Sequence, residues 1–165
     1  MKIEEYIKSL PNDIISGNEV QLPERSFRKI FEFLNLNEND VFYHIGCGDG
    51  KGIKIALQEF HVKKAIGVDN SKEKIQQAKK LAEENDLNGK SFLCQDAVTA
   101  KIDDATAILF WFTDIEIIEK MKKRFQSLQD GCKIVTIWGP LPECLPAQVD
   151  FPYIINQVPF KHADL

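Results

Sequence analysis

The chain has 165 residues, of which 44% are hydrophobic and 28% charged, a balance that excludes both a disordered chain and a membrane protein. This length suits one domain, so we expect residues 1–165 to form a single unit. The formal net charge of -4 argues against sequence-independent binding of nucleic acid, because such binding requires a basic surface.

The sequence carries no sign of export, of a membrane span or of a zinc site. Acidic residues stand where a signal peptide would be positively charged, and no apolar segment follows them, so we expect a cytoplasmic protein. No apolar run approaches the roughly 20 residues that span a bilayer. The 4 cysteines form no C-x-x-C pair and no histidine stands at zinc-finger spacing, which predicts reduced, mostly buried thiols and no metal site.

The first part of the chain, residues 1–39, reads as a helical segment. Residues 3–10 predict a short helix that ends at Pro11, and residues 12–21 read as a loop. Pro23 fits the first turn of a second helix. Its apolar positions recur at helical spacing: Phe27, Ile30, Phe31 and Leu34.

From residue 40 onward, strands and helices alternate. Apolar runs predict strands at residues 41–45, 64–68, 91–94, 105–112 and 133–138. Helices are predicted between them at residues 51–60, 71–86 and 114–128, with Ser71 as a cap of the second. This order predicts a doubly wound, mainly parallel α/β sheet with helices on both faces, which forms the core over residues 40–165.

The tail departs from this alternation because it holds five of the 7 prolines. Residues 153–158 predict a last strand, with residues 148–151 as its short partner. Proline confines such strands to sheet edges or strand ends. We therefore expect short antiparallel strands at the C-terminus.

A glycine-rich loop follows the first predicted strand, in the sequence His44-Ile45-Gly46-Cys47-Gly48-Asp49-Gly50. Glycines permit a sharp turn and let a ligand approach the backbone. The dinucleotide fingerprint G-x-G-x-x-G fails in both registers, because its third glycine would be Lys51 or Ile53, and no P-loop is present. The loop thus predicts a ligand other than a pyrophosphate cofactor, and its plain alternative is a tight turn.

Two acidic residues follow the next two predicted strands. Asp69, with Asn70 beside it, ends the second strand, where a carboxylate can accept both hydroxyl hydrogens of a ribose. Asp96 follows the third strand, where its carboxylate can accept from the exocyclic amine of adenine and the Ala97 amide can donate to the ring. Each acid has an alternative role as a turn residue.

With these motifs in place, the chain resembles the class I, Rossmann-like S-adenosylmethionine-dependent methyltransferases over residues 41–138. Gly46, Gly48 and Gly50 match the glycine motif of that family, Asp69 its ribose acid and Asp96 its adenine-side acid. The wider pattern, which includes residues 22–24 and 62–68, is similar to small archaeal protein-lysine methyltransferases. The resemblance implies S-adenosylmethionine as cofactor, S-adenosylhomocysteine as product and a protein lysine as the favoured acceptor.

One residue departs from the family pattern. Two residues before the first glycine the family usually has Asp or Glu, which helps to place the amino group of the methionine moiety, and this chain has His44. An imidazolium would repel that ammonium group, so we expect cofactor affinity to fall below about pH 6.5, the ordinary pKa of histidine. The alternative is that His44 is a spectator at a strand end.

The acceptor is expected to meet the methyl group near the end of the fourth strand. Thr113 and Asp114 are candidates to orient an amine there, and Asp114 is equally a helix N-cap. Trp111 or Phe112 is expected to face the sulfonium by a cation–π contact, with the other in the sheet core. Residues 22–25 are expected to cover the cofactor, and residues 138–142 to border the acceptor channel or simply to close the fold.

Three functions remain open at this point. The first is methyl transfer to a protein lysine, and the second is methyl transfer to a small molecule. The third is a non-catalytic S-adenosylmethionine-binding or interaction module, which His44 and the short tail favour, because a missing final hairpin would leave a sheet edge free to pair with another chain. The acceptor is thus a protein or small molecule, with neither nucleic acid nor membrane expected; the oligomeric state is left open.

Overall fold

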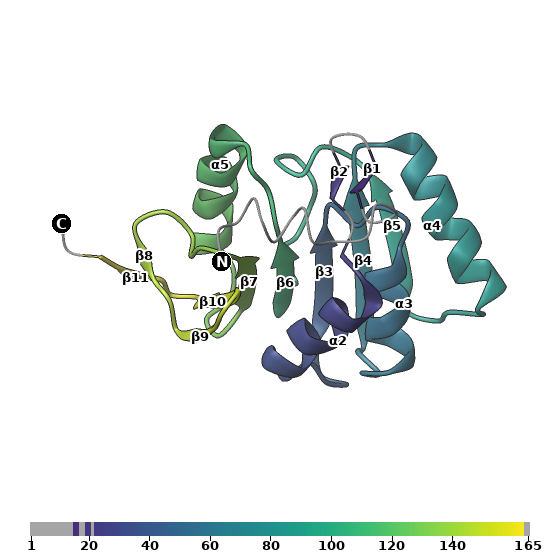
Figure 1. Cartoon of the computed structure of the whole chain (residues 1–165), viewed down its shortest axis with the longest axis horizontal. Helices are drawn as coiled ribbons and strands as arrows, with labels where there is room; N and C mark the ends of the chain where they lie inside the picture. Colours follow the sequence, from purple (N-terminus) through teal and green to yellow (C-terminus); the bar gives the residue numbers. More distant parts are fainter. Residues whose placement is uncertain (1–14, 17–18, 21, 164–165) are drawn as a thin grey trace.

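The computed structural model describes residues 15–16, 19–20 and 22–163, so the helix predicted at residues 3–10 lies outside the described part. A seven-stranded sheet forms the centre of this part (Figure 1). Its strands, in spatial order, are β5 (Lys90–Cys94), β4 (Lys64–Asp69), β3 (Val41–Ile45), β6 (Ala107–Phe110), β7 (Lys133–Ile137), β10 (Tyr153–Gln157) and β9 (Gln148–Asp150). The first five are parallel and β10 is antiparallel to both of its neighbours, which confirms the predicted sheet.

Helices cover both faces of the sheet, as predicted. On one face α2 (Glu24–Phe33) and α3 (Lys51–Gln58) share a hydrophobic cluster with β3 and β6. On the other face α5 (Ile115–Gln126) buries Met121 and Phe125 against a second cluster. Helix α4 (Lys72–Glu84) begins at Ser71, whose side chain accepts a hydrogen bond from the backbone N–H of Lys74. Buried side chains on both faces identify the central strands as the core of the fold.

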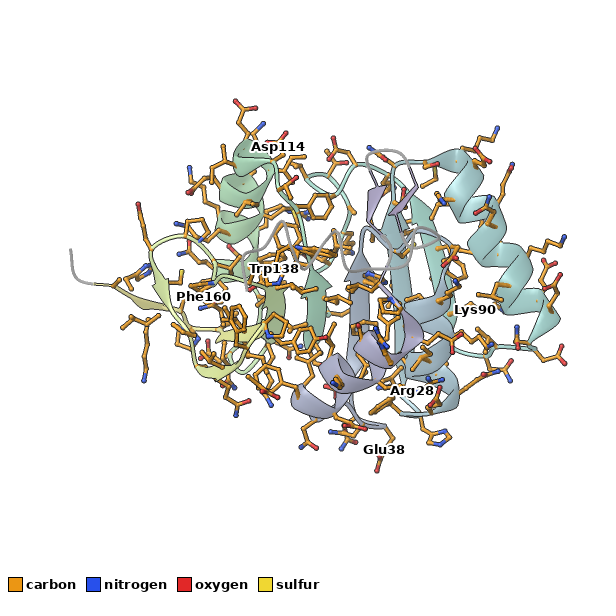
Figure 2. All side chains as sticks on the ribbon, viewed as in Figure 1. Arg28, Glu38, Lys90, Asp114, Trp138 and Phe160 are labelled. Atoms are coloured by element: carbon orange, nitrogen blue, oxygen red, sulfur yellow. The ribbon has the colours of Figure 1, made fainter. Side chains whose placement is uncertain are left out.

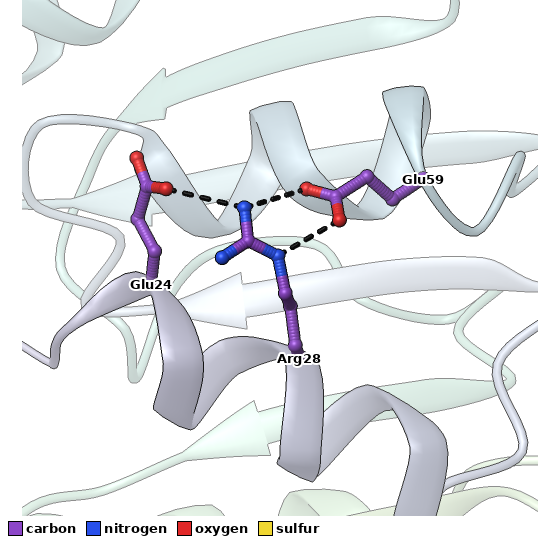
Figure 3. Close-up of polar contacts among 3 residues, drawn as sticks. All are labelled: Glu24, Arg28 and Glu59. Atoms are coloured by element: carbon purple, nitrogen blue, oxygen red, sulfur yellow. Dashed lines mark hydrogen bonds and ion pairs between the residues drawn. The ribbon is translucent and has the colours of Figure 1, made fainter.

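A bidentate ion pair ties α2 to the end of α3. The Arg28 guanidinium donates to both carboxylate oxygens of Glu59, at 2.8 and 3.0 Å, and to Glu24 at 3.2 Å (Figure 3). These hydrogen bonds from Arg28 lower the pKa of the Glu59 carboxyl. The apolar side of α2 faces inward and buries Phe27. The pairing joins α2 to α3 at the surface, while the buried apolar side of α2 holds Phe27 near the carboxyl ends of the strands.

The structure differs from the predicted elements in three places. Residues 12–21 are expected to form a loop, yet β1 (Ile15–Ser16) and β2 (Glu19–Val20) lie within this range and pair with each other in antiparallel orientation. Strand β6 ends at Phe110 rather than Phe112. Strands β8 (Cys144–Leu145) and β11 (Lys161–His162) pair outside the main sheet, and two residues are too few to give a periodic signal.

The tail completes the sheet. Strand β10 lies between β7 and β9, with Tyr153 opposite Ile137 on one side and Asp150 on the other. The edge of β7 that a missing hairpin would leave open is therefore covered, and this reason for a purely interacting module falls away. Among the described residues, no helix has the length and apolar character to cross a membrane.

Candidate cofactor and acceptor site

A cavity of about 390 Å³ opens at the carboxyl ends of β3, β4 and β6. The strand order reverses between β3 and β6, and open α/β sheets bind ligands at such a point. Ten of the predicted site residues line it: His44, Gly46, Cys47, Gly48, Asp69, Asn70, Asp96, Ala97, Phe112 and Thr113. The two that do not are Gly50 and Asp114.

The glycine loop turns immediately after β3. The backbone N–H groups of Gly46 and Cys47 both donate to the Val68 carbonyl, at 2.7 and 3.0 Å, which ties the loop to the end of β4. Gly48 has φ +53°, and no atom lies within 4 Å of where a Cβ would stand. Gly50 has φ +85°, and its Cβ would lie 2.9 Å from the Ala78 Cβ on α4. Gly48 thus leaves open space at the cavity, whereas Gly50 permits close packing of α3 and α4.

The carboxylate of Asp69 is fixed by two backbone donors. The N–H of Gly48 donates to Oδ2 at 3.0 Å and the N–H of Ser71 donates to Oδ1 at 2.9 Å. An ionised carboxylate offers about four acceptor sites, so each oxygen can accept one more hydrogen bond. Asp69 is half-buried and lines the cavity, and its role as the ribose acid stays a prediction.

The segment that carries Asp96 is held in place by α5. The Asp96 carboxylate accepts from the backbone N–H of Val98 at 2.9 Å, as a turn residue does. The Arg124 guanidinium donates to the carbonyl oxygens of Ala97, at 2.7 Å, and Ala100. Asp96 therefore has both the predicted place at the cavity and the alternative turn role. No helix follows β5, and Arg124 supplies the anchoring that a helix would give.

His44 is buried at the floor of the cavity, with 7% of its surface exposed. Phe27 meets the imidazole edge-on at 5.5 Å, and among the described residues Nδ1 has no hydrogen-bond partner. Burial lowers the pKa of His44 from its ordinary 6.5 to about 4, because an apolar site disfavours the charged ring. The imidazole therefore stays neutral at physiological pH, and the expected loss of cofactor affinity below pH 6.5 is corrected to a loss near pH 4.

Protonation of His44 should instead be visible in stability. Between about pH 6.5 and 4 the unfolded chain binds a proton that the folded chain does not, so the free energy of unfolding falls as the pH falls. For the pKa of about 4, the loss between pH 7.5 and 4.5 is roughly 2–3 kcal/mol. Urea unfolding across this range measures it, while the dissociation constant for S-adenosylhomocysteine stays flat from pH 5.5 to 8.

His44→Gln gives the matched control, because glutamine is polar, neutral and does not titrate in this range. Every other group titrates alike in both proteins, so the difference between the two stability profiles isolates the imidazole. Parallel profiles from pH 7.5 to 4.5 would show that His44 is protonated in the folded protein at its ordinary pKa.

After β6 the chain leaves the sheet, and the side chains of Trp111 and Phe112 lie on opposite sides of it. Phe112 stacks on Phe110 at 4.8 Å, on the α5 side, and lies 3.5 Å from the place of a Cβ on Gly46. Trp111 packs on the α2 side and also lines the cavity. Because successive residues point to opposite faces of the sheet, Trp111 and Phe112 lie on different faces, as expected, yet both line the cavity.

Thr113 and Asp114 end this segment at the start of α5. Thr113 is exposed at the rim of the cavity. The Asp114 carboxylate accepts from the backbone N–H groups of Glu116 and Ile117, at 2.9 and 3.3 Å, so its alternative role as helix N-cap is confirmed. Figure 2 shows Asp114 at the outer end of α5, pointing away from the sheet. Orientation of an acceptor amine by either residue stays a prediction.

The charges that line the cavity have one sign. Its ionisable side chains include Asp49, Asp69 and Asp96, and among the described lining residues there is no lysine or arginine. A lysine outside the lining, Lys51, lies 3.6 Å from Asp49. Burial raises the pKa of the Cys47 thiol to about 12, so this cysteine is not a nucleophile. The site therefore favours a cationic ligand, such as a sulfonium with an ammonium group.

Sequence reasoning omitted several residues that line the cavity. These include Phe27, Val68, Gln95, Leu109 and Ile117. The periodicity of α2 assigned Phe27 to the core, and it does lie there, at 5% exposure, with its ring edge toward the cavity residue His44. Helical spacing does not reveal that a core residue also borders a ligand site.

Comparisons with known proteins agree with this geometry. Residues 42–134, more than half of the chain, match the family model described as a methyltransferase domain. The chain is 31% identical over 119 residues to a protein-lysine N-methyltransferase of Saccharolobus islandicus (strain REY15A), which covers 71% of this chain and 73% of that protein.

Solved structures share the fold. An RNA methyltransferase from Salinibacter ruber in complex with S-adenosyl-L-homocysteine superposes with a TM-score of 0.78 and 21% identity, over 84% of this chain and 94% of that one. A geranyl diphosphate C-methyltransferase from Streptomyces coelicolor A3(2) gives a TM-score of 0.61 and 17% identity, over 69% and 46%. On the strength of the matched family model and the aligned relative, the chain belongs to the class I, Rossmann-like family of S-adenosylmethionine-dependent methyltransferases.

Proposed function

We propose that this enzyme methylates lysine side chains of proteins. The observation that carries the proposal is the 31% identity with a protein-lysine N-methyltransferase, because the alignment covers 71% of the chain. The family resemblance noted in the sequence also includes the segment Leu22-Pro23-Glu24 ahead of β3. Leu22 lines the cavity and is thus placed to border an acceptor.

Electrostatics support an amine acceptor over a phosphate-bearing one. The carboxylates of Asp49, Asp69 and Asp96 line the cavity, without a lysine or arginine among its described lining residues. A lysine ammonium is attracted to such a surface, whereas the phosphates of RNA or of a prenyl diphosphate are repelled. Asp69 and Asp96 are assigned to the cofactor rather than the acceptor, so the negative lining disfavours a phosphate-bearing acceptor through the field of the whole cavity.

Several residues that line the cavity would bind the cofactor. Asp69 would accept hydrogen bonds from the ribose hydroxyls, and the segment of Asp96 and Ala97 would border the adenine. Gly48 would leave room for the cofactor to approach the backbone of the loop. When bound, S-adenosylmethionine supplies a methyl group activated by its sulfonium, which passes to an unprotonated lysine nitrogen and leaves S-adenosylhomocysteine. Little acid–base machinery is needed, since alignment of the reactants lowers much of the barrier.

Methyl transfer to three classes of acceptor tests the proposal. The enzyme is incubated at pH 8 with tritiated S-adenosylmethionine and, in separate reactions, poly-L-lysine, free L-lysine or total RNA. We expect label on poly-L-lysine, recovered after acid hydrolysis as methyllysine. Asp69→Ala serves as the control for contaminating activity, because at subsaturating S-adenosylmethionine its weakened cofactor binding should lower the label at least about tenfold.

Each outcome assigns the acceptor differently. Label on free lysine with none on poly-L-lysine would favour the small-molecule alternative. Label on RNA with none on lysine would contradict the electrostatic argument. Binding of S-adenosylhomocysteine without transfer to any of the three would favour the non-catalytic module and would overturn the proposal.

A further inference from the structure

Two tryptophans stand at the ends of neighbouring strands beside the cavity. Trp111 follows β6 and lines the cavity, and Trp138 follows β7. Their ring centroids lie 5.2 Å apart at an interplanar angle of 85°, an edge-to-face contact. Both pack on the α2 side of the sheet, as Leu22 does. Figure 2 shows Trp138 beside β6 and β7, and its side chain is partly buried.

Trp138 is held in an unfavourable backbone conformation. Its φ of +74° lies in the left-handed region, which is rare for a bulky side chain and costs roughly 1–2 kcal/mol. The backbone N–H of Trp138 donates to the Pro152 carbonyl at 2.6 Å, and the Thr136 hydroxyl donates to the Gly139 carbonyl at 2.6 Å. Such strain persists where the surroundings fix it, often at functional sites. A glycine would meet the backbone requirement without this cost.

The cavity differs in character between its two ends. Asp69 and Asp96 supply carboxylate hydrogen-bond acceptors at one end of the cavity. Leu22, Phe27 and Trp111 form an apolar wall at the other end. The face of an indole ring attracts an alkylammonium group within about 6 Å, and its apolar surface packs against methylenes. A lysine side chain combines both features.

We infer that Trp111 contacts the acceptor lysine and that Trp138 is a positioning residue, which fixes the orientation of the Trp111 ring. This inference rests on the proposed lysine activity and deepens it. The edge contact from Trp138 restrains Trp111 from one side, and the tail hairpin restrains Trp138 through Pro152. The C-terminal hairpin thereby contributes to acceptor alignment without lining the cavity.

A double-mutant cycle with poly-L-lysine as substrate tests this relation. Trp111→Leu should lower kcat/KM for poly-L-lysine by about 30-fold, and Trp138→Gly by about tenfold. Because Trp138 acts through Trp111, the double variant should fall no more than about twofold below Trp111→Leu alone. Trp138→Phe should recover most of the activity, since a ring edge remains. The dissociation constant for S-adenosylhomocysteine should stay within about threefold of the wild-type value in Trp138→Gly.

Phe60→Leu is the matched control. Phe60 meets Phe31 edge-on at 5.5 Å and 83°, on the same hydrophobic cluster, but it does not line the cavity. Its kcat/KM should stay within about twofold of wild type. Full activity of Trp138→Gly, or multiplicative losses in the double variant, would overturn the inference while leaving the proposed function intact. Absence of methyllysine with the wild-type enzyme would instead overturn the proposed function, and the inference with it.

Discussion

Replacement of Asp69 by alanine is expected to raise the dissociation constants for S-adenosylmethionine and S-adenosylhomocysteine at least 100-fold. The carboxylate already accepts from the backbone N–H groups of Gly48 and Ser71, and as a residue that lines the cavity it has about two acceptor sites left for a ligand. A hydrogen bond to a charged group is worth about 1.5–3 kcal/mol, and two of them therefore correspond to a factor of 100 or more. Calorimetric titration of both ligands at pH 7.5 measures the change.

Two variants separate the causes of this loss. Asp69→Asn keeps one acceptor oxygen but loses the charge, so we expect an intermediate loss of about tenfold. Asp49→Asn removes another carboxylate of the same cavity, one that accepts from the Lys51 backbone N–H at 3.3 Å and pairs with the Lys51 ammonium. Such an exposed pair contributes little, and affinity should change by less than about threefold. Equal losses in Asp69→Ala and Asp49→Asn would mean that net charge, rather than ribose recognition, controls binding.

Most of the sheet could be predicted from the sequence because each buried parallel strand is an apolar run between turn signals. The strand at Val41–Ile45 has the predicted limits, and the run at residues 105–112 contains β6, which lies at the centre of the sheet. The apolar run extends beyond the end of β6, because Trp111 and Phe112 are apolar for a different reason: they line the cavity. Hydrophobicity alone does not distinguish a strand residue from an aromatic residue at a ligand site.

The polar half of the site could be predicted because its residues follow strand ends in chain order. Asp69 and Asp96 both line the cavity for this reason. The state of His44 could not be predicted, since its low pKa depends on burial beneath Phe27, which comes from a helix 17 residues earlier in the chain. The Trp111–Trp138 contact likewise depends on adjacent strands that an entire helix separates in sequence. Such contacts require the tertiary structure.

The alternating glycines are expected to respond differently to alanine, although the sequence motif treats them alike. Gly50→Ala places a Cβ 2.9 Å from the Ala78 Cβ and 3.1 Å from its Cα, in a backbone conformation with φ +85°. Left-handed strain costs roughly 1–2 kcal/mol and overpacking a further 1–3, so we expect a total loss of about 3 kcal/mol in unfolding free energy. For a chain of this length that lowers Tm by roughly 10 °C.

Gly48→Ala is the matched partner in this experiment. With φ +53° and no atom within 4 Å of the added Cβ, its cost in stability should be about 1 kcal/mol, from backbone strain alone. Because Gly48 lines the cavity, the added methyl group occupies space that the ligand needs, and cofactor affinity should fall at least tenfold. Thermal unfolding and calorimetry on both variants measure the two effects. If Gly48→Ala binds as tightly as wild type, the ligand does not approach the loop at this residue, and the glycine serves the turn rather than the cofactor.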